Sequence, residues 1–367
     1  MKFTCERSVL LKEISIAQEI ILSKNAISIL SNIYLEAHDD TLIIKSTDIK
    51  VNFETKVPVT VLEEGSTTVF GDKFLGILNN IPDGELEFDQ NDTKIVIKPQ
   101  NKKIKFQLKS IASDKFPEFP VPSAENAFEL PVKEFKEMIL QTVFAVSDDE
   151  TRYFMNGVFC EKQEDKLVMV GTDGRRLAYI ARDAGSEVPD FTGIIIPPKI
   201  LNILLKRAGD EGLVSISITD KTIFIKFGSY ELSSTLIEGQ FPNYRRVIPE
   251  TQTHSFTLSR FEMLDALKRV SLLVEQKSRR IYLTVNSGGI TVKSEESDIG
   301  NADEEISCSY EGDEVSIALN YRYLEEPFKV MTDDEVNIYF SEANRAITIK
   351  PVPEKNFFHI IMPMQVD

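Results

Sequence analysis

Side chains that ligate metals or act as nucleophiles are scarce in this sequence. Its 367 residues include three widely separated cysteines and three isolated histidines: Cys5, Cys160, Cys308, His38, His254 and His359. No pair of cysteines has the CxxC spacing of a zinc site or a redox pair, so we expect reduced thiols that pack as small hydrophobic groups. The sequence offers little for a metal site or a Ser–His–Asp triad, and we predict neither a metal nor a cofactor.

Long apolar runs are absent as well. No stretch reaches the roughly 18 apolar residues of a membrane span, and the start, MKFTCERSVLLKE, lacks the features of a secretory signal. We therefore expect a cytoplasmic protein with no membrane partner. The formal net charge of −16 disfavours non-specific coating of nucleic acid, because that affinity comes mainly from clustered lysine and arginine. If DNA is a partner, a local positive surface or something other than affinity must hold it.

An internal repeat organises the chain. Three pairs of segments share an offset of 125 residues: LIIKSTD at 42–48 with LVMVGTD at 167–173, FPEF at 116–119 with FPNY at 241–244, and Phe3 with Phe128. A third, weaker copy begins at Phe256 and contains ITVKSEESD at 290–298. Agreement of three anchors on one offset indicates a true repeat. We predict an α+β fold of three domains, at 1–120, 126–248 and 252–367.

Each copy is predicted to contain a strand, an amphipathic helix, paired strands, a second helix and closing strands. The first helix of each copy carries apolar residues at three- and four-residue spacing: Leu10, Ile14, Ala17 and Ile21; Phe135, Met138, Ile139, Val143 and Val146; Phe261, Leu264, Leu267 and Leu273. Ser259 and Glu262 form a capping box before the third of these helices. Second helices are predicted within 72–80, 197–209 and 320–331, and Pro327 is expected to kink or shorten the last one.

The stretch GTDGRRLAY at 171–179 resembles a phosphate loop at first sight. Copy one holds the same strand and turn as KSTDIKV, without glycines or arginines after it. Thr172 and Asp173 are therefore predicted to form an Asx-type turn that serves the fold. A nucleotide-using enzyme is the rival interpretation, and the missing GxxxxGK[ST] spacing disfavours it. Only Gly174, Arg175, Arg176 and Leu177 then need a functional account.

Five motifs together resemble the bacterial DNA polymerase III β subunits, the sliding clamps: GTDGRRLAY, FPNYRRVIP at 241–249, RYFMNGV at 152–158, the start MKFTCERSVLLK, and IIMPMQ at 360–365. The resemblance covers the whole chain in register. It implies a head-to-tail homodimer that closes a ring of six domains around double-stranded DNA, with helices lining the hole. It also implies a non-catalytic processivity factor, loaded by an ATP-dependent clamp loader, that tethers the replicative polymerase and other proteins through a peptide-binding groove.

Elementary geometry supports two chains per ring. Six helices about 9 Å apart would close a circle only about 17 Å across, whereas twelve reach about 34 Å. Only the larger circle admits a duplex after a helix thickness of roughly 10–12 Å is subtracted. Residues 1–120, 121–250 and 251–367 carry net charges of −3, −5 and −8, yet a closed ring needs no tight phosphate contacts, and its acidic outside discourages side-on binding. A monomeric peptide-binding adaptor that does not encircle DNA is the alternative.

The resemblance also assigns site residues. The peptide groove would comprise Met155, Thr172, Gly174, Arg175, Arg176, Leu177, Pro242, Arg246, Val247, Asn320, Tyr323, Ile360, Ile361, Met362, Pro363 and Met364. Leu177, Val247, Ile360 and Met362 would offer apolar surface, Met362 would adapt to varied side chains, and Arg246 would orient the peptide. The alternative for the MPM tail is a final strand that fills core.

By the same resemblance, Lys24, Arg152, Tyr153 and Lys199 correspond to positions near DNA in the family. Charge clustering adds Lys206, Arg207, Lys268, Arg269, Lys277, Arg279 and Arg280, with solvated helix faces as the alternative interpretation. Leu272 and Leu273 match positions of the subunit contact, and intradomain core is their alternative. Departures from the family pattern are Arg175, where histidine is frequent, the ending Gln365-Val366, and Pro327. The first two concern ligand preference rather than the pocket itself.

Overall fold

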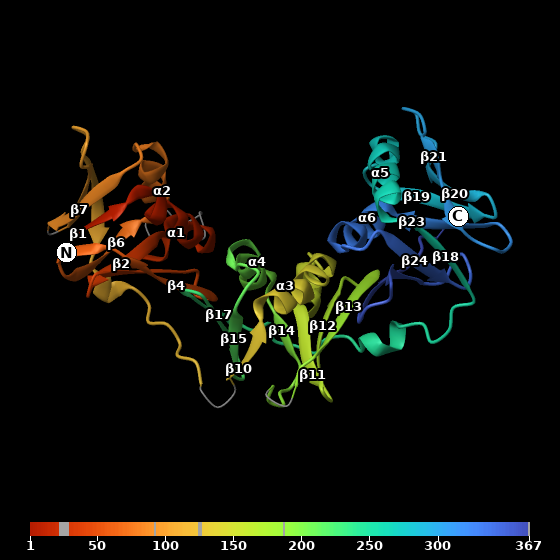
Figure 1. Ribbon diagram of the computed structural model, residues 1–367, viewed down its shortest axis with the longest axis horizontal. Helices are drawn as coiled ribbons and strands as arrows, with labels where there is room; N and C mark the ends of the chain where they lie inside the picture. The colour runs from red at the N-terminus through yellow and green to blue at the C-terminus, as the bar shows by residue number, and fades with distance from the viewer. Residues whose placement is uncertain (22–28, 92, 124–126, 186–187, 366–367) are drawn as a thin grey trace. The chain divides into compact units, whose positions relative to one another are not determined.

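The computed structural model describes residues 1–21, 29–91, 93–123, 127–185 and 188–365 (Figure 1). Lys24 and Val366, two residues discussed above, lie outside these ranges. Internal contacts group the chain into two compact units, residues 1–133 with 199–236 and residues 134–198 with 237–367. The central repeat is shared between the units, because its strands pair with those of the first repeat on one side and of the third repeat on the other.

The first unit contains one antiparallel sheet of thirteen strands. Their order is β10 (Ala127–Pro131), β15 (Leu213–Ile218), β16 (Thr222–Phe227), β17 (Tyr230–Thr235), β4 (Val51–Pro58), β3 (Thr41–Thr47), β2 (Asn32–His38), β6 (Gly65–Phe70), β9 (Phe106–Ile111), β8 (Lys94–Pro99), β7 (Glu85–Asn91), β1 (Lys2–Glu6) and β5 (Thr60–Glu63). Pairing of β17 with β4 joins the second repeat to the first, with Leu232 opposite Phe53. Alternation along β3, where Leu42 and Ile44 are buried, places the apolar side chains on one face.

Helices cover this sheet in the first unit (Figure 1). α1 (Arg7–Ile20) packs on α2 (Gly71–Asn80) and on β3 and β4. Leu10, Ile14 and Ala17 are fully buried, which confirms the predicted apolar face of α1. α4 (Pro198–Arg207) begins with its proline and places Leu201 and Leu204 in the core.

The second unit contains two antiparallel sheets. The larger one has the order β14 (Ile194–Ile196), β11 (Val158–Gln163), β12 (Lys166–Thr172), β13 (Arg176–Asp183), β26 (Phe357–Ile361), β25 (Ile347–Val352), β24 (Glu335–Phe340), β18 (His254–Ser259) and β22 (Cys308–Ser309). The smaller one has the order β21 (Asp303–Ile306), β20 (Gly289–Ser294), β19 (Arg280–Asn286) and β23 (Val315–Asn320). Pairing of β13 with β26 joins the second repeat to the third.

The predicted first helix of copy two is too long. α3 (Val132–Leu140) starts at the end of the first unit and stops six residues before Val146. Thr142 N donates to Ile139 O at 3.1 Å, which tightens the chain into a short 3-10 turn, η3 (Val143–Ala145). The helix therefore ends where a hydrogen bond from residue i to residue i−3 replaces the α-helical bond from i to i−4.

The apolar face predicted for copy three is also wrong in part. α5 (Arg260–Val270) buries Met263, Leu267 and Val270, whereas Phe261 is 54% exposed. The helix is rotated because Arg260 points inward and donates from Nη1 to Phe328 O at 3.1 Å, with its guanidinium carbon 4.0 Å from the Phe261 ring centre. The predicted cap is confirmed, since Ser259 Oγ accepts from Glu262 N at 3.4 Å.

Pro327 does not shorten its helix. α6 (Tyr321–Val330) has ten residues, as α2 and α4 do, and Met331 N donates to Pro327 O at 3.1 Å beyond the proline. The helix ends at Val330, within one turn after Pro327, so the missing N–H interrupts only its last turns.

Two glycines should respond oppositely to alanine. Gly76 lies in α2, and no atom lies within 4 Å of a Cβ added there, whereas Gly174 has φ +86°. We expect Gly76→Ala to raise the free energy of unfolding by about 0.5–1 kcal/mol through helix propensity. Gly174→Ala should lower it by about 1 kcal/mol, because an L side chain disfavours the left-handed region. Thermal unfolding at a fixed protein concentration measures both, and equal responses would contradict the assignment.

Candidate functional site

The stretch at 171–177 is a self-bonded turn. Thr172 Oγ1 accepts from Gly174 N at 3.1 Å, and Asp173 Oδ1 accepts from Arg175 N at 2.9 Å and from Arg176 N at 3.1 Å. These are the bonds of an Asx-type turn. The backbone N–H groups of the turn are therefore occupied by its own side chains.

Copy one has the same turn. Thr47 Oγ1 accepts from Ile49 N at 2.9 Å, and Asp48 Oδ1 accepts from Lys50 N at 3.0 Å and Val51 N at 2.7 Å. The residue after Asp48, Ile49, has φ +80°, close to the φ of +86° at Gly174. The predicted structural role of the Thr-Asp pair is confirmed, and the turn is not a phosphate loop.

Arg176 ties this turn to the rest of the second unit. Its Nε donates to Asp173 Oδ2 at 3.0 Å, its Nη2 donates to Phe144 O at 2.7 Å, and its Nη1 bonds Glu326 on α6. Its guanidinium also lies 4.5 Å from the ring centre of Tyr323, and the side chain is only 10% exposed. Arg176 thus holds the turn against α6, and its donors already have partners.

Leu177 and Ile360, two residues of the predicted groove, are buried. They are direct neighbours across β13 and β26, and each is only 3% exposed within a cluster that also includes Phe241 and Tyr244. The apolar surface expected from these two residues is therefore covered. The exposed apolar groups are instead Val247 (54%), in the 3-10 turn η5 (Tyr244–Val247), and Met362 (45%).

The C-terminal tail is not a core-filling strand. β26 ends at Ile361, and the tail is then held by Met362 N, which donates to Arg175 O at 2.9 Å, and by Met364 N, which donates to Ala318 O at 2.8 Å. A cavity of about 760 Å³ borders Met362, Pro363, Met364 and Gln365. The tail thus presents its methionines at the surface.

The remaining predicted groove residues fall into two groups. Buried positions below the surface are Met155, Thr172 and Ile361, whereas Gly174, Arg175 and Arg246 are exposed and Pro242 is half-buried. Asn320 caps α6, since its Oδ1 accepts from Arg322 N at 3.0 Å. The structure therefore brings the tail, the turn and the start of α6 together within one unit.

His359 lies buried beneath this surface. Gln141 Nε2 donates to Val330 O at 3.1 Å, which fixes the orientation of the Gln141 amide. Gln141 Oε1 therefore faces His359 Nε2 at 3.0 Å and accepts a hydrogen bond from its N–H. Burial, and then the charge of Arg176, lowers the pKa of His359 to about 3. The imidazole is therefore neutral in the folded protein at ordinary pH.

The predicted DNA-contacting cations of α4 already have partners in the first unit. Lys199 Nζ donates to Ile20 O at 2.7 Å and to Asp48 Oδ2 at 2.6 Å, while Lys206 and Arg207 both pair with Glu19, at 3.0 and 3.1 Å. Lys199 thus stabilises the end of α1 and the first Thr-Asp turn. The positive charge of this helix is partly neutralised.

The other described residues predicted near DNA lie in the second unit. Arg152 and Tyr153 belong to η4 (Glu150–Met155), where Arg152 Nε pairs with Asp149 at 3.0 Å and Tyr153 is 53% exposed. Arg269 forms two bonds to Glu304, at 2.8 and 2.6 Å, and Arg280 pairs with Glu295 at 3.4 Å. Lys268 and Lys277 are exposed, and Arg279 is half-buried.

Leu272 is not intradomain core. It is 78% exposed in η6 (Ser271–Leu273), and Leu273 is half-buried. Sequence reasoning missed two charged segments that could have been found by counting: residues 94–109 contain six lysines and no acid, and residues 294–305 contain six acids and no lysine or arginine. The acidic segment includes β21, the edge strand of the smaller sheet, and the 76% exposed Ile299.

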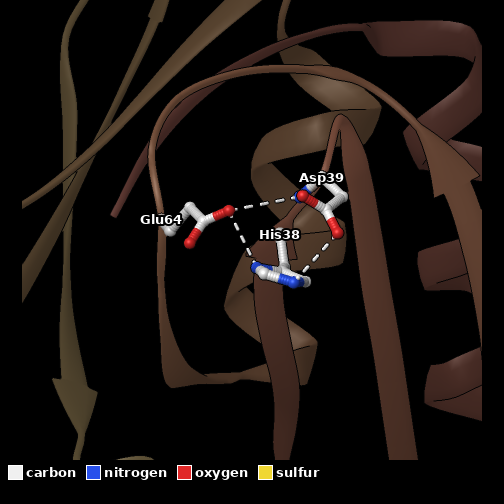
Figure 2. Close-up of side chains that lie close together, drawn as sticks. All are labelled: His38, Asp39 and Glu64. Carbon is white, nitrogen blue, oxygen red and sulfur yellow. Dashed lines mark hydrogen bonds and ion pairs between the residues drawn. The ribbon is translucent and has the colours of Figure 1, made fainter.

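His38 does not stand alone, contrary to the sequence-based expectation (Figure 2). Its Nδ1 lies 2.8 Å from Glu64 Oε1 and its Nε2 lies 3.1 Å from Asp39 Oδ2, and these two carboxylates raise the pKa of His38, Glu64 foremost. The three groups offer ligand atoms within 4.8 Å of one another, but all three are exposed and each ring nitrogen already faces a carboxylate. The geometry suits a hydrogen-bonded imidazolium rather than a metal centre.

The cysteines are free thiols. Burial is the main reason that the pKa of Cys5 is raised to about 11 and that of Cys160 to about 12. Both thiols therefore remain protonated. Within the described residues, no helix is both long and apolar enough to span a membrane.

The chain is thus built from repeated modules of helices on antiparallel sheets, with a structural turn in place of a phosphate loop. Three family models match it in chain order: the N-terminal domain of the DNA polymerase III beta subunit at residues 1–120, the central domain at 129–243 and the C-terminal domain at 245–365. The beta sliding clamp of Treponema pallidum is 48% identical over 371 residues and is covered completely, as is this chain.

Solved structures agree. The sliding clamp of Bartonella birtlesii, bound to griselimycin, aligns over 100% of both chains with a TM-score of 0.94 and 28% identity. The DNA polymerase III subunit beta of Borrelia burgdorferi, in complex with a natural product, aligns over 100% of this chain and 99% of its own with a TM-score of 0.92 and 26% identity. The chain belongs to the family of DNA polymerase III β subunits, the bacterial sliding clamps, which are non-catalytic processivity factors of DNA replication. The resemblance and the α+β fold of three clamp domains are confirmed.

His359 should make stability depend on pH in a defined window. Its pKa is depressed, so the unfolded chain binds a proton that the folded protein excludes; stability is fully present above about pH 6.5 and is lost as pH falls toward 3. The expected slope from this one group is about 1.4 kcal/mol per pH unit. Denaturant unfolding between pH 4 and 8 should show that His359→Asn removes this component.

His38→Asn is the matched comparison. The pKa of His38 is raised, so its contribution is present below pH 6.5 and is lost as pH rises through the folded value. Its replacement should therefore leave the acid slope intact. An unchanged acid slope in His359→Asn would contradict the buried neutral imidazole.

Proposed function

We propose that two copies of this chain form a closed ring that encircles double-stranded DNA, slides along it and tethers the replicative polymerase and other proteins. An ATP-dependent clamp loader would place the ring on DNA in the cytoplasm, at the nucleoid. The observation that carries the proposal is the ordered match of three β-subunit domain models along the chain. The three predicted domains, 1–120, 126–248 and 252–367, would be the repeating units of the ring.

Surface charge supports a head-to-tail contact. The lysine-rich segment 94–109 lies in the first unit, and the acidic segment 294–305 lies in the second. Opposite charges on two different surfaces of one chain favour a heterologous contact, which closes a ring when its rotation allows. The exposed Leu272 and Ile299 would supply its apolar centre, and the open edge of β21 could pair with a neighbouring strand.

The charge pattern also suits sliding. Lys199, Lys206 and Arg207 share their charge with Asp48 and Glu19, so a duplex would meet few unpaired cations on α4. Weak phosphate contacts allow movement along DNA. Retention would come from the closed path of the ring around the duplex rather than from charge.

The docking groove is proposed over the pair Leu177 and Ile360. Met362 and Val247, two further residues of the predicted groove, are exposed, and exposed apolar side chains favour an interaction surface. The thioether of Met362 adapts to different anchors. A peptide that displaces the Met362 side chain would gain access to the buried pair.

The ring itself can be tested on nicked circular DNA. The wild-type protein should have a mass near twice 41.6 kDa, remain on the circle after loading, and run off once the circle is cut. Leu272→Asp should yield monomers that are not retained, because a carboxylate in the apolar subunit contact is costly to desolvate.

Leu213→Asp, an exposed leucine on β15, is the control and should behave as wild type. Retention after linearisation would contradict encirclement. A monomeric wild type that still binds peptides would favour the adaptor alternative.

Met362→Asp should abolish measurable binding of a short apolar anchor peptide. The loss expected for a central apolar contact is about 2 kcal/mol or more. Fluorescence polarisation measures the affinity, and Val121→Asp, which changes another exposed apolar residue, should leave it unaltered. Unchanged affinity in Met362→Asp would rule out this groove.

A further inference from the structure

A cavity of about 290 Å³ lies in the first unit, beside the linker that follows the first repeat. Linker residues between 119 and 123 border it on one side, and residues of β4, β15, β16 and β17 border it on the other. Its volume lies at the small end of the roughly 300–1,000 Å³ that is usual for ligand cavities. The space therefore suits a small molecule.

Side chains from four neighbouring strands form one wall of the cavity. Asn52 stands opposite Ser233 across β4 and β17. Phe224 on β16 stands opposite both Ser233 and Ser217, the latter on β15. Side chains at paired positions project from the same face of a sheet, and Phe53, next to Asn52, is fully buried on the other face. This wall is therefore a continuous row across the sheet.

The linker is attached on both sides of the cavity. At its far end, Ser217 Oγ donates to Ser123 O at 2.8 Å. At its near end, the ring of Phe119 lies 6.0 Å from that of Phe116 and 5.5 Å from Lys45 Nζ, measured between ring centres and from the ring centre. The cavity is thus preformed, because neither border is left to move independently of the sheet.

Two aromatic rings line the cavity from different segments. Phe119 comes from the linker and Phe224, which is 9% exposed, comes from β16. Among the residues that the structure describes, these two rings are not in contact with each other. Pro120 and Pro122 add apolar surface on the linker side. A flat ring inside the cavity would therefore find aromatic partners, which favour offset or edge-to-face packing.

The serines of the cavity have unused hydrogen-bonding capacity. Ser233 is 5% exposed, and its Oγ accepts from Asn52 Nδ2 at 3.0 Å, but its own O–H meets no acceptor within the described ranges. Asn52 Oδ1 is taken by Thr47 Oγ1 at 2.6 Å. Ser217 has given its proton to the linker, so its oxygen can still accept a hydrogen bond. The cavity thus offers a buried donor and a buried acceptor to a ligand.

The charged groups at the cavity are already paired. Glu54 stands directly opposite Glu231 across β4 and β17, a like-charge pair that would attract a cation. Lys45 Nζ lies 3.0 Å from Glu54, however, and Lys226 Nζ lies 2.7 Å from Glu231. A charged ligand would lose its hydration without gaining a free counter-ion. The cavity therefore favours a neutral ligand.

We propose that this cavity binds a small neutral molecule that carries a carboxamide on an aromatic ring. The carboxamide oxygen would accept from Ser233 O–H, and its NH₂ would donate to Ser217 Oγ, because a carboxamide is both acceptor and donor. The ring would pack between Phe119 and Phe224. All residues of this site belong to the first unit, whereas those of the proposed docking groove belong to the second, so the site is additional to the groove.

Ligand-detected NMR titration of the full-length protein with benzamide tests the site. Benzamide should bind about 10-fold more tightly than benzoate, which has the same shape but is charged and has no N–H. It should bind about 5-fold more tightly than acetophenone, which keeps the carbonyl and the ring but lacks the donor. Equal affinities for the three probes, or no binding of benzamide, overturn the proposal.

Three variants locate the bound molecule. Ser233→Ala should weaken benzamide binding about 5- to 10-fold through loss of the buried donor, and Ser215→Leu should abolish it by placing an apolar side chain in the cavity. Ser229→Ala is the matched control, since Ser229 also accepts a side-chain bond, from Thr55 Oγ1 at 3.3 Å, but lies outside the cavity. It should keep the wild-type affinity.

Thermal unfolding without ligand establishes that each variant is folded, and the filled cavity of Ser215→Leu gives a result even if Ser233→Ala proves unstable. Benzamide binding that survives in folded Ser215→Leu overturns the site. So does a loss in Ser229→Ala as large as that in Ser233→Ala, since binding would then not depend on the cavity.

Discussion

Pairing of β13 with β26 is the constraint on which the candidate site depends. It sets Leu177 opposite Ile360 and Arg176 opposite Ile361, so the end of the chain lies beside a turn far away in sequence. The ladder then continues outside the strands, where Met362 N donates to Arg175 O. Both backbone groups are satisfied by this pairing, which fixes the register. The exposed tail and the arginine turn therefore share one rigid support.

An equivalent strand pairing occurs in the first unit, with different side chains at the paired positions. There β4 pairs with β17, and Ser233 stands opposite Asn52 where the second unit has Ile360 opposite Leu177. Asn52 Nδ2 donates to Ser233 Oγ at 3.0 Å, so the equivalent place holds a polar pair. The same backbone pairing thus carries a polar pair of side chains in the first unit and an apolar pair in the second. Side-chain chemistry at two positions makes the difference.

Charges on this protein are arranged locally rather than in bulk. Glu19 and Asp48 neutralise much of α4, while Asp149, Asp173 and Glu326 take up two of the five arginines that line a cavity of the second unit. A strongly acidic chain can therefore carry a cationic cavity, because ion pairs compensate charges over a few ångströms and salt screens the remainder.

The sequence by itself determined the repeat, the element order and the role of the Thr-Asp pair, because these depend on local periodicity and on side chains bonding their own backbone. The sequence also predicted the position of the helix that contains Pro327, but the expected shortening of that helix was wrong. The face of α5 depended on Arg260 finding the carbonyl of Phe328, and the burial of Leu177 depended on a strand nearly two hundred residues away. The grouping of Arg279 and Arg322 with Arg175 likewise required three distant segments to meet. Only the tertiary structure decided these features, because burial, register and the balance of a charge cluster are set by contacts that no local pattern encodes.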